Sequence, residues 1–322
     1  MKTMRSYRGA ALAALLSLAF ASPGSAQFDR VRRAASGAAA QSINPARLLE
    51  APPPITTSLA DARWAVDSLD SHSPDSGSFK LLTELQRTPN GGFVLQPGHW
   101  AMQDQSYCLK AGTHGPGGGD GYLYAPPRGP AEQAVVSILR NSVQHPDIAQ
   151  RDIQVLLWAI IAHAKFEDLP AGMKATASRL LTPQQIATLN RSALDLIPEG
   201  MLEQTLASVP EPAKTILRAE AQLRSMVTSA NNTYDDLERV AVLAGVVPRG
   251  QGSRDVPSGR WSLHPDGYYV RYIPSGYSST RTEIWVPEGS PAVGKEYDPA
   301  LHIAVPGNTS RQRLIQSARP RS

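Results

Sequence analysis

Cysteine is almost absent from this sequence: the 322 residues contain one, Cys108. A single cysteine forms no internal disulfide, so the fold must be held together by packing and hydrogen bonds. Aromatic residues make up only 6% of the chain. Beyond the first 26 residues, no apolar run reaches the roughly 20 residues that span a bilayer, so we expect no transmembrane anchor.

The first 26 residues have the three parts of a secretory signal peptide. Three basic residues lie before residue 9, residues 10–20 are apolar, and residues 24–26 are the small residues Gly-Ser-Ala. This order is typical of a leader that is cleaved on export. We therefore expect an exported protein that is periplasmic, on the cell surface or extracellular.

An excess of positive charge is also lacking once the leader is set aside. The whole chain has 32 basic and 28 acidic residues, and the leader holds three of the basic ones, which leaves 32 − 3 = 29 against 28. A nucleic-acid-binding face needs many more unpaired cations than this balance provides. We expect no nucleic-acid partner.

Composition and hydrophobic periodicity divide the rest of the chain into segments. They predict an α+β protein whose central domain is mixed but mainly helical, with short strands, and is followed by a small antiparallel β module. The predicted segments are a flexible Ala/Pro/Ser-rich arm (27–60), the central helical domain (61–247), a polar linker (248–258), an aromatic β-hairpin module (259–305) and a basic disordered tail (306–322).

Apolar residues at helical spacing predict the helices of the central domain. Thr182 before Pro183 is a typical helix start, because threonine caps the first turn and proline fits the first helical position. The predicted helices are 131–145, 148–167, 183–194, 212–229 and 234–243. Short strands are predicted at 93–95 and 106–109, and alternation predicts a hairpin of 268–273 with 280–286.

Gln154 is the one polar residue in the run IQVLLWAIIA, which covers residues 153–162. A helix that is apolar on all sides is a buried helix. An unpaired amide there would cost roughly 2 kcal/mol or more, so Gln154 needs a partner. An ordinary hydrogen bond would satisfy the amide. A cysteine thiolate could instead attack it, expel ammonia and leave a thioester.

Two short motifs carry a family resemblance over residues 93–166. Tyr107-Cys108-Leu109 is an aromatic-Cys motif, and Gln154 follows the cysteine by 46 residues, four before Trp158. Together they resemble the thioester domains of bacterial surface adhesins. The resemblance implies that Cys108 and Gln154 form an internal thioester, shielded by Trp158, which an amine such as lysine opens. Ile153 stands where the family usually has Thr, and the 46-residue spacing is shorter than in better-known members.

A cysteine hydrolase is an alternative class of function. Cys108 would then need a base, and the candidates are the histidines at 99, 114, 145 and 163 and the carboxylate of Asp120. Of these, His114 lies nearest Cys108 in sequence, and Asp120 belongs to the glycine-rich loop that follows. No hydrolase signature accompanies them, so this class stays open as an alternative.

A non-covalent binding protein is the other alternative. Exposed aromatic side chains can stack on sugar rings, and the hairpin module supplies Trp261, Tyr268, Tyr269 and Tyr277. The glycine-rich loop lacks the GK[ST] ending of a phosphate-binding loop, and we find no metal-binding motif, so we expect neither a cofactor nor a metal. The expected partner is an extracellular or envelope macromolecule that carries an amine or a sugar.

Overall fold

The computed structural model describes residues 44–55, 59–63 and 79–321. The predicted signal peptide and most of the predicted arm lie outside these residues. Within the arm, the described part is ordered: α2 (Ala46–Glu50) forms a short helix, and Leu48 and Ile55 are buried. Residues 44–322 group as a single unit rather than as separate modules.

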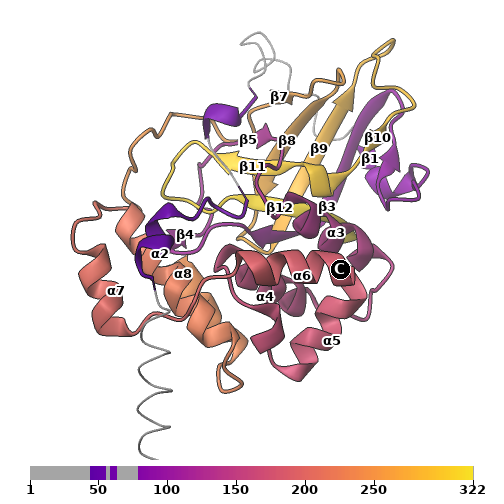
Figure 1. Cartoon of the computed structure of the whole chain (residues 1–322). Helices are drawn as coiled ribbons and strands as arrows, with labels where there is room; N and C mark the ends of the chain where they lie inside the picture. Colours follow the sequence, from indigo (N-terminus) through magenta and orange to yellow (C-terminus); the bar gives the residue numbers. More distant parts are fainter. Residues whose placement is uncertain (1–43, 56–58, 64–78, 322) are drawn as a thin grey trace, which may run out of the picture. The chain divides into compact units, whose positions relative to one another are not determined.

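Strand β3 (Gly98–Cys108) is the longest strand and lies at the centre of a large sheet. The strand order is β5-β11-β12-β3-β9-β8-β7, with neighbours antiparallel, and β1 (Lys80–Leu81) adds a short parallel pairing to β3. The backbone N–H of Tyr124 in β5 donates to Ser262 Oγ in β7 at 2.9 Å, which joins the two edges. The sheet is thereby a nearly closed barrel (Figure 1). The remaining bounds are β5 Tyr122–Ala125, β7 Ser262–Leu263, β8 Tyr269–Pro274, β9 Ser279–Val286, β11 Ile303–Pro306 and β12 Leu314–Pro320.

The prediction of a mainly helical central domain with a separate β module is therefore wrong. The structure has 35% helix and 22% strand, and one barrel-like sheet unites the predicted domains. The predicted hairpin does form as β8 and β9, but β9 also pairs with β3 through Trp100 opposite Ile284. The predicted disordered tail holds β12, which lies between β11 and β3. Its basic residues have partners: Arg319 donates to the carbonyl oxygens of Pro146 and Ile148.

Helices pack along one side of the barrel (Figure 1). The predicted helices appear with ends shifted by a few residues, and Thr182 forms the expected capping box with Gln185. The bounds are α3 Glu132–Val143, α4 Gln150–Ile161, α5 Ala171–Leu180, α6 Pro183–Ser192, α7 Glu199–Leu206, α8 Ala213–Val227 and α9 Tyr234–Ala241. Two small sheets complete the fold: β2 (Phe93–Val94) with β10 (Glu296–Tyr297), and β4 (Thr113–His114) with β6 (Val242–Leu243).

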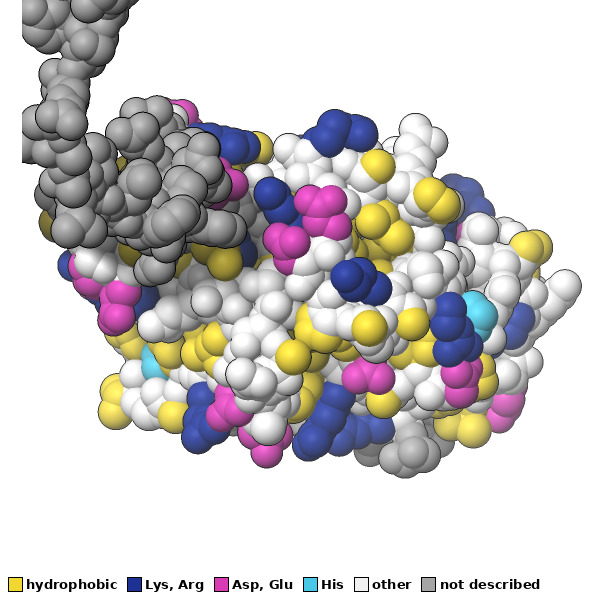
Figure 2. Space-filling view, turned by 60° about the horizontal axis from the view of Figure 1, so that its bottom comes forward, with side chains coloured by type: hydrophobic (Ala, Val, Ile, Leu, Met, Phe, Trp, Pro, Cys, Tyr) yellow, Lys and Arg dark blue, Asp and Glu magenta, His cyan; other side chains and the backbone are white. Residues whose placement is uncertain are grey.

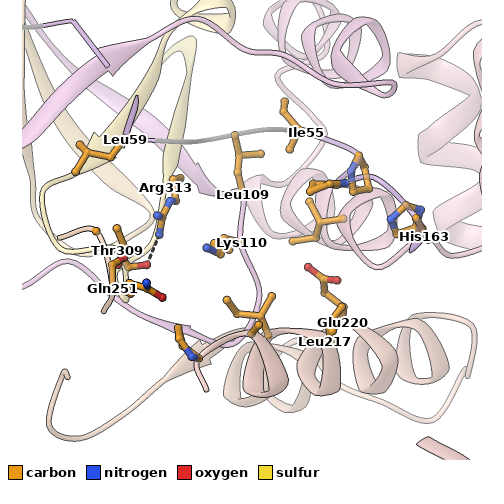
Figure 3. Close-up of a pocket in the computed structure, with 18 of the residues that line it drawn as sticks. Ile55, Leu59, Leu109, Lys110, His163, Leu217, Glu220, Gln251, Thr309 and Arg313 are labelled. Atoms are coloured by element: carbon orange, nitrogen blue, oxygen red, sulfur yellow. Dashed lines mark hydrogen bonds between the residues drawn. The ribbon is translucent and has the colours of Figure 1, made fainter. Parts of the chain in front are cut away.

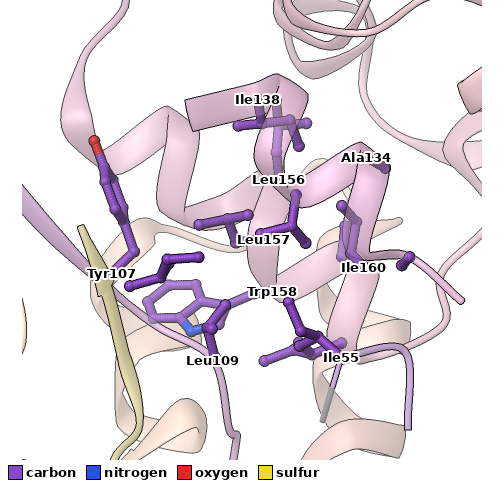
Figure 4. Close-up of a cluster of buried hydrophobic side chains, with 14 of the residues drawn as sticks. Ile55, Tyr107, Leu109, Ala134, Ile138, Leu156, Leu157, Trp158 and Ile160 are labelled. Carbon is purple, nitrogen blue, oxygen red and sulfur yellow. The ribbon is translucent and has the colours of Figure 1, made fainter. Parts of the chain in front are cut away.

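Helix α4 is buried on nearly all sides, as its sequence predicts. Ile153, Leu157 and Trp158 have no exposed surface, and α4 contacts β3, α3, α8 and α9. Figure 4 shows Trp158 against Leu109 and Leu157 in this core. The core therefore joins the barrel to the helices, and α4 is the element through which they meet.

The barrel interior contains a buried carboxyl group. Asp104 of β3 is fully buried, and burial raises the pKa of its side chain well above the usual value. The hydroxyl of Tyr272 is also buried and lacks a hydrogen-bond partner among the described residues, and the hydroxyl of Thr282 acts on Asp104. The interior of the barrel is therefore partly polar, unlike the core around α4.

The surface is mixed in charge. On the face in Figure 2, acidic and basic side chains are interspersed with apolar ones, with no broad patch of one sign. In the described part of the chain, every helix falls short of the length and apolarity needed to cross a membrane. The same residues contain no cluster of three His, Cys, Asp or Glu side chains suited to a metal ion.

Candidate functional site

The site lies where β3 extends beyond its partner β9, while its other edge still pairs with β12. β9 pairs with β3 only as far as Ser279 opposite Gln105, and beyond that point α4 approaches the free edge. Gln150 in the first turn of α4 donates to the carbonyl oxygens of Ser106 at 3.1 Å and Ser278 at 2.7 Å. A helix side chain thus replaces a strand as the hydrogen-bond partner of β3.

Gln154, one turn further along α4, hydrogen-bonds to the backbone of Cys108. The Cys108 N–H donates to Gln154 Oε1 at 2.8 Å, and Gln154 Nε2 donates to the Cys108 carbonyl at 3.2 Å. Both residues are buried, with 1% and 0% of their surfaces exposed. The partner that the sequence requires for Gln154 is therefore Cys108 itself.

These two hydrogen bonds place the Gln154 carboxamide beside the backbone of Cys108, because the amide binds both backbone groups that flank the Cys108 Cα. Cys108 is a free thiol in this structure.

The surroundings of Cys108 favour its neutral form. Burial raises the pKa of the thiol well above its usual value, and the negative charge of Glu238 raises it further. A thiol becomes a strong nucleophile only after it loses its proton. Any reaction at Cys108 therefore needs a base, and Glu238 is the carboxylate whose charge acts on this thiol.

Glu238 belongs to a hydrogen-bonded group at the partly exposed side of the site. Tyr277 donates to Glu238 Oε1, and the hydroxyls of Tyr277 and Tyr234 lie 2.8 Å apart. The Tyr234 ring packs on Trp158 with ring centres 5.2 Å apart, and the Arg151 guanidinium lies 4.8 Å from the same ring. We call Tyr234, Glu238 and Tyr277 the outer triad.

Both tyrosines of the outer triad have phenol pKa values above the usual one, mainly because they are partly buried. Burial raises the pKa of Tyr234 to about 12. For Tyr277 burial acts first and the hydrogen bond to Glu238 acts second, both raising its pKa. Both phenols therefore stay protonated at neutral pH, so they can donate hydrogen bonds and pass protons. Sequence reasoning missed Tyr234 and Glu238, although their spacing of four residues on α9 places them on one helix face.

Trp158 has a polar ring N–H as well as the apolar surface expected to shield the thioester. Its ring is fully buried, and its Nε1–H has no hydrogen-bond partner among the described residues. A buried donor left unpaired costs about 1–3 kcal/mol. Trp158 follows Gln154 by one helical turn, so the two side chains lie on the same face of α4.

The other predicted supporting residues are separate from the thiol chemistry. Tyr107 is buried in the core, and its hydroxyl donates to Gln105 at 3.1 Å. Asp120 forms an ion pair with Arg311 at 2.8 Å and accepts the Gly117 N–H at 2.9 Å, which makes it a turn residue. These contacts give Asp120 no role as a base for Cys108.

The histidines considered as bases have other surroundings. His114 is buried in β4, where its backbone N–H donates to the Ser310 carbonyl at 2.9 Å, and burial lowers the pKa of its imidazole ring. His99 stacks on Trp285, and His145 lies 3.1 Å from Arg179. His163 has its pKa lowered by burial to about 4. The cysteine–histidine pair of a hydrolase finds no support in these contacts.

The aromatic residues predicted to bind sugars divide into two groups. Trp261 and Tyr268 are 2% and 1% exposed, so they are core residues and the prediction that they bind a partner is wrong. Tyr269 is partly exposed and stacks on Trp285 with ring centres 4.8 Å apart. Tyr277 is the residue of the outer triad, which places it at the Cys108 site rather than on a separate surface.

A cavity of about 770 Å³ lies beside Leu109 and Lys110, the two residues that follow Cys108 (Figure 3). It begins at Leu109 and Lys110, and neither Cys108 nor Gln154 lines it. Its walls are mainly apolar, and Lys110 extends between Arg313 and Glu220. The cavity and the Cys108 site are therefore neighbours in the chain but distinct places in the fold.

Comparison with known protein families, with curated proteins and with solved structures finds no match to this chain.

Proposed function

We propose that this is an exported envelope or surface protein that captures amines covalently through an internal thioester between Cys108 and Gln154. The observation that carries the proposal is the pair of hydrogen bonds between the Gln154 carboxamide and the Cys108 backbone, in a fully buried setting. The partner would be an extracellular or envelope macromolecule that presents a primary amine. The predicted leader supports the exported location.

Thioester formation requires the Cys108 thiol to give up its proton and attack Cδ of Gln154. The C–S bond forms, the C–N bond breaks, and the nitrogen leaves as ammonia after it takes up a proton. Glu238, whose negative charge acts on this thiol, would accept the thiol proton. The acyl oxygen of the thioester is the same Oε1 that accepts the Cys108 N–H before the reaction, and the departing nitrogen no longer donates to the Cys108 carbonyl.

Capture is the second step. An amine attacks the acyl carbon, an amide bond to the Gln154 side chain forms, and the C–S bond breaks to regenerate the Cys108 thiol. A lysine arrives as an ammonium ion and must lose a proton before it attacks. The carboxylate of Glu238 would attract that cation and take its proton.

The competing interpretation is that Gln154 only holds the helix against the strand, as Gln150 does. Gln150 lies one turn earlier on α4 and also hydrogen-bonds the backbone of β3, but it does not contact the cysteine. It is therefore the matched control residue for every experiment on Gln154.

The intact mass of the purified mature chain, with its N-terminus determined, tests the proposal. Thioester formation expels ammonia, so the wild type and Gln150→Ala should weigh about 17 Da less than their sequences predict. Cys108→Ala and Gln154→Ala should have their full masses. Methylamine should bring the wild type to about 14 Da above the sequence mass. A wild type of full mass that methylamine leaves unchanged would overturn the proposal.

A further inference from the structure

The cavity beside Lys110 is a second site, independent of the Cys108 chemistry. Its apolar wall comes from three separate parts of the chain that converge on one space. They are the ordered end of the arm, the end of α4 and one face of α8, which contribute Leu48, Ile55, Leu59, Ile161, Ile216 and Leu217. A volume of about 770 Å³ is within the range of small-molecule binding sites.

Lys110 is the polar centre of the cavity. No acceptor lies within hydrogen-bond distance of its ammonium group among the residues that the structure describes, although most of the side chain is enclosed. Burial, together with the positive charge of Arg313, lowers the pKa of Lys110 to about 7. An anion bound beside Lys110 would satisfy the ammonium and offset both effects.

The remaining charges indicate how much negative charge a ligand can bring. Arg254 and Arg313 also line the cavity, and Arg313 Nη1 donates to the carbonyl oxygens of Thr309 and Arg311. Among the described residues Glu220 is the one acidic residue in the wall, and burial raises its pKa to about 7. Its carboxylate faces the same space as Lys110 and would repel a doubly charged group such as a phosphate.

We propose that this cavity binds a long-chain carboxylate, with the carboxylate at Lys110 and the aliphatic chain along the apolar wall of the arm, α4 and α8. Figure 3 shows the two parts of such a site: apolar side chains around Ile55 and Leu217, and Lys110 beside Arg313. A single negative charge would pair with Lys110 and meet less repulsion from Glu220 than a doubly charged group.

Binding of palmitate to the purified mature chain, measured by displacement of a fluorescent fatty acid, tests the proposal. Hexadecanol and hexadecylamine have the same chain with a neutral and a positive head group. Palmitate should bind at least tenfold more tightly than either. Equal affinities, or no displacement by palmitate, would overturn the proposal, and monododecyl phosphate binding more tightly than dodecanoate would replace the carboxylate with a phosphate.

Three variants locate the ligand. Lys110→Met should weaken palmitate binding at least tenfold and leave hexadecanol binding unchanged, whereas Lys174→Met, an exposed lysine on α5, should change neither. Leu217→Trp should weaken both ligands because it fills the chain site. If Lys110→Met does not fold, Leu217→Trp still tests the location, and unchanged palmitate binding in Leu217→Trp would show that the ligand binds elsewhere.

Discussion

Removal of the Gln154 side chain should be one of the most destabilising single changes in the helical core. The experiment is best done in a Cys108→Ala background, because that chain cannot form a thioester and the hydrogen bonds are then measured alone. Gln154→Ala leaves the N–H and the carbonyl of residue 108 buried without a partner. Each unsatisfied group costs about 1–3 kcal/mol, and the better helix propensity of alanine returns less than about 0.5 kcal/mol.

We therefore expect Gln154→Ala to lower the free energy of unfolding by about 3–5 kcal/mol. Gln150→Ala in the same background should cost only about 1 kcal/mol, because the Ser278 carbonyl keeps the Ser106 N–H at 3.2 Å and only the Ser106 carbonyl loses its donor. Urea unfolding followed by circular dichroism measures both. Equal costs for the two glutamines would refute the reasoning, since they would mean that the Gln154 hydrogen bonds contribute nothing beyond ordinary helix docking.

Three further predictions concern the charged groups of the site, the barrel and the cavity. Glu238→Gln should slow methylamine opening of the thioester at pH 7 at least tenfold without abolishing it, since a general base contributes about 10²–10⁴-fold; the rate of mass change measures this, and Glu203→Gln on the surface is the control. Asp104→Asn should raise the melting temperature at pH 7 and lose this advantage near pH 4, because the pKa of buried Asp104 is raised in the fold, so its contribution to stability is lost as pH rises; an equal effect at both pH values would contradict this. The pKa of Glu220 is raised to about 7, so the free energy of unfolding should fall as pH rises from about 4.5 to 7. The pKa of Lys110 is lowered to about 7, so the free energy of unfolding should rise again between about pH 7 and 10.5. Lys110→Met should therefore abolish the rise above pH 7 in unfolding titrations but keep the fall below it.

The sequence predicted local structure well and long-range pairing poorly. The helices followed from apolar spacing and from signals such as Thr182-Pro183, which act within a few residues. The hairpin followed from alternation around a Pro-Ser-Gly turn. The barrel could not be predicted in the same way, because β3 pairs with strands more than 170 residues later in the chain, such as Ile284 opposite Trp100. Nothing in the strand itself names those partners.

The disorder predicted for residues 306–322 shows why composition misled. Four arginines without nearby acids are typical of a solvated tail. In the fold, these side chains bind carbonyl oxygens, a hydroxyl and one carboxylate instead: Arg319 binds Pro146 and Ile148, and Arg311 pairs with Asp120. A positive side chain can thus be held by partners that no charge count detects. Gln154 was the opposite case, because its isolation in an apolar run required a partner and left few candidates.

The position of Gln154 at the point where β3 passes from a strand partner to a helix partner has a mechanical consequence. A thioester there would be a staple that fastens the barrel to the helical layer and closes a loop of 46 residues, a constraint that is worth about 4 kcal/mol in the chain-entropy description. An amine that opens the thioester breaks this internal cross-link and at the same time forms a covalent bond to the partner. Capture would therefore leave the protein tied to its target and internally looser, so the captured form should be the more easily unfolded of the two.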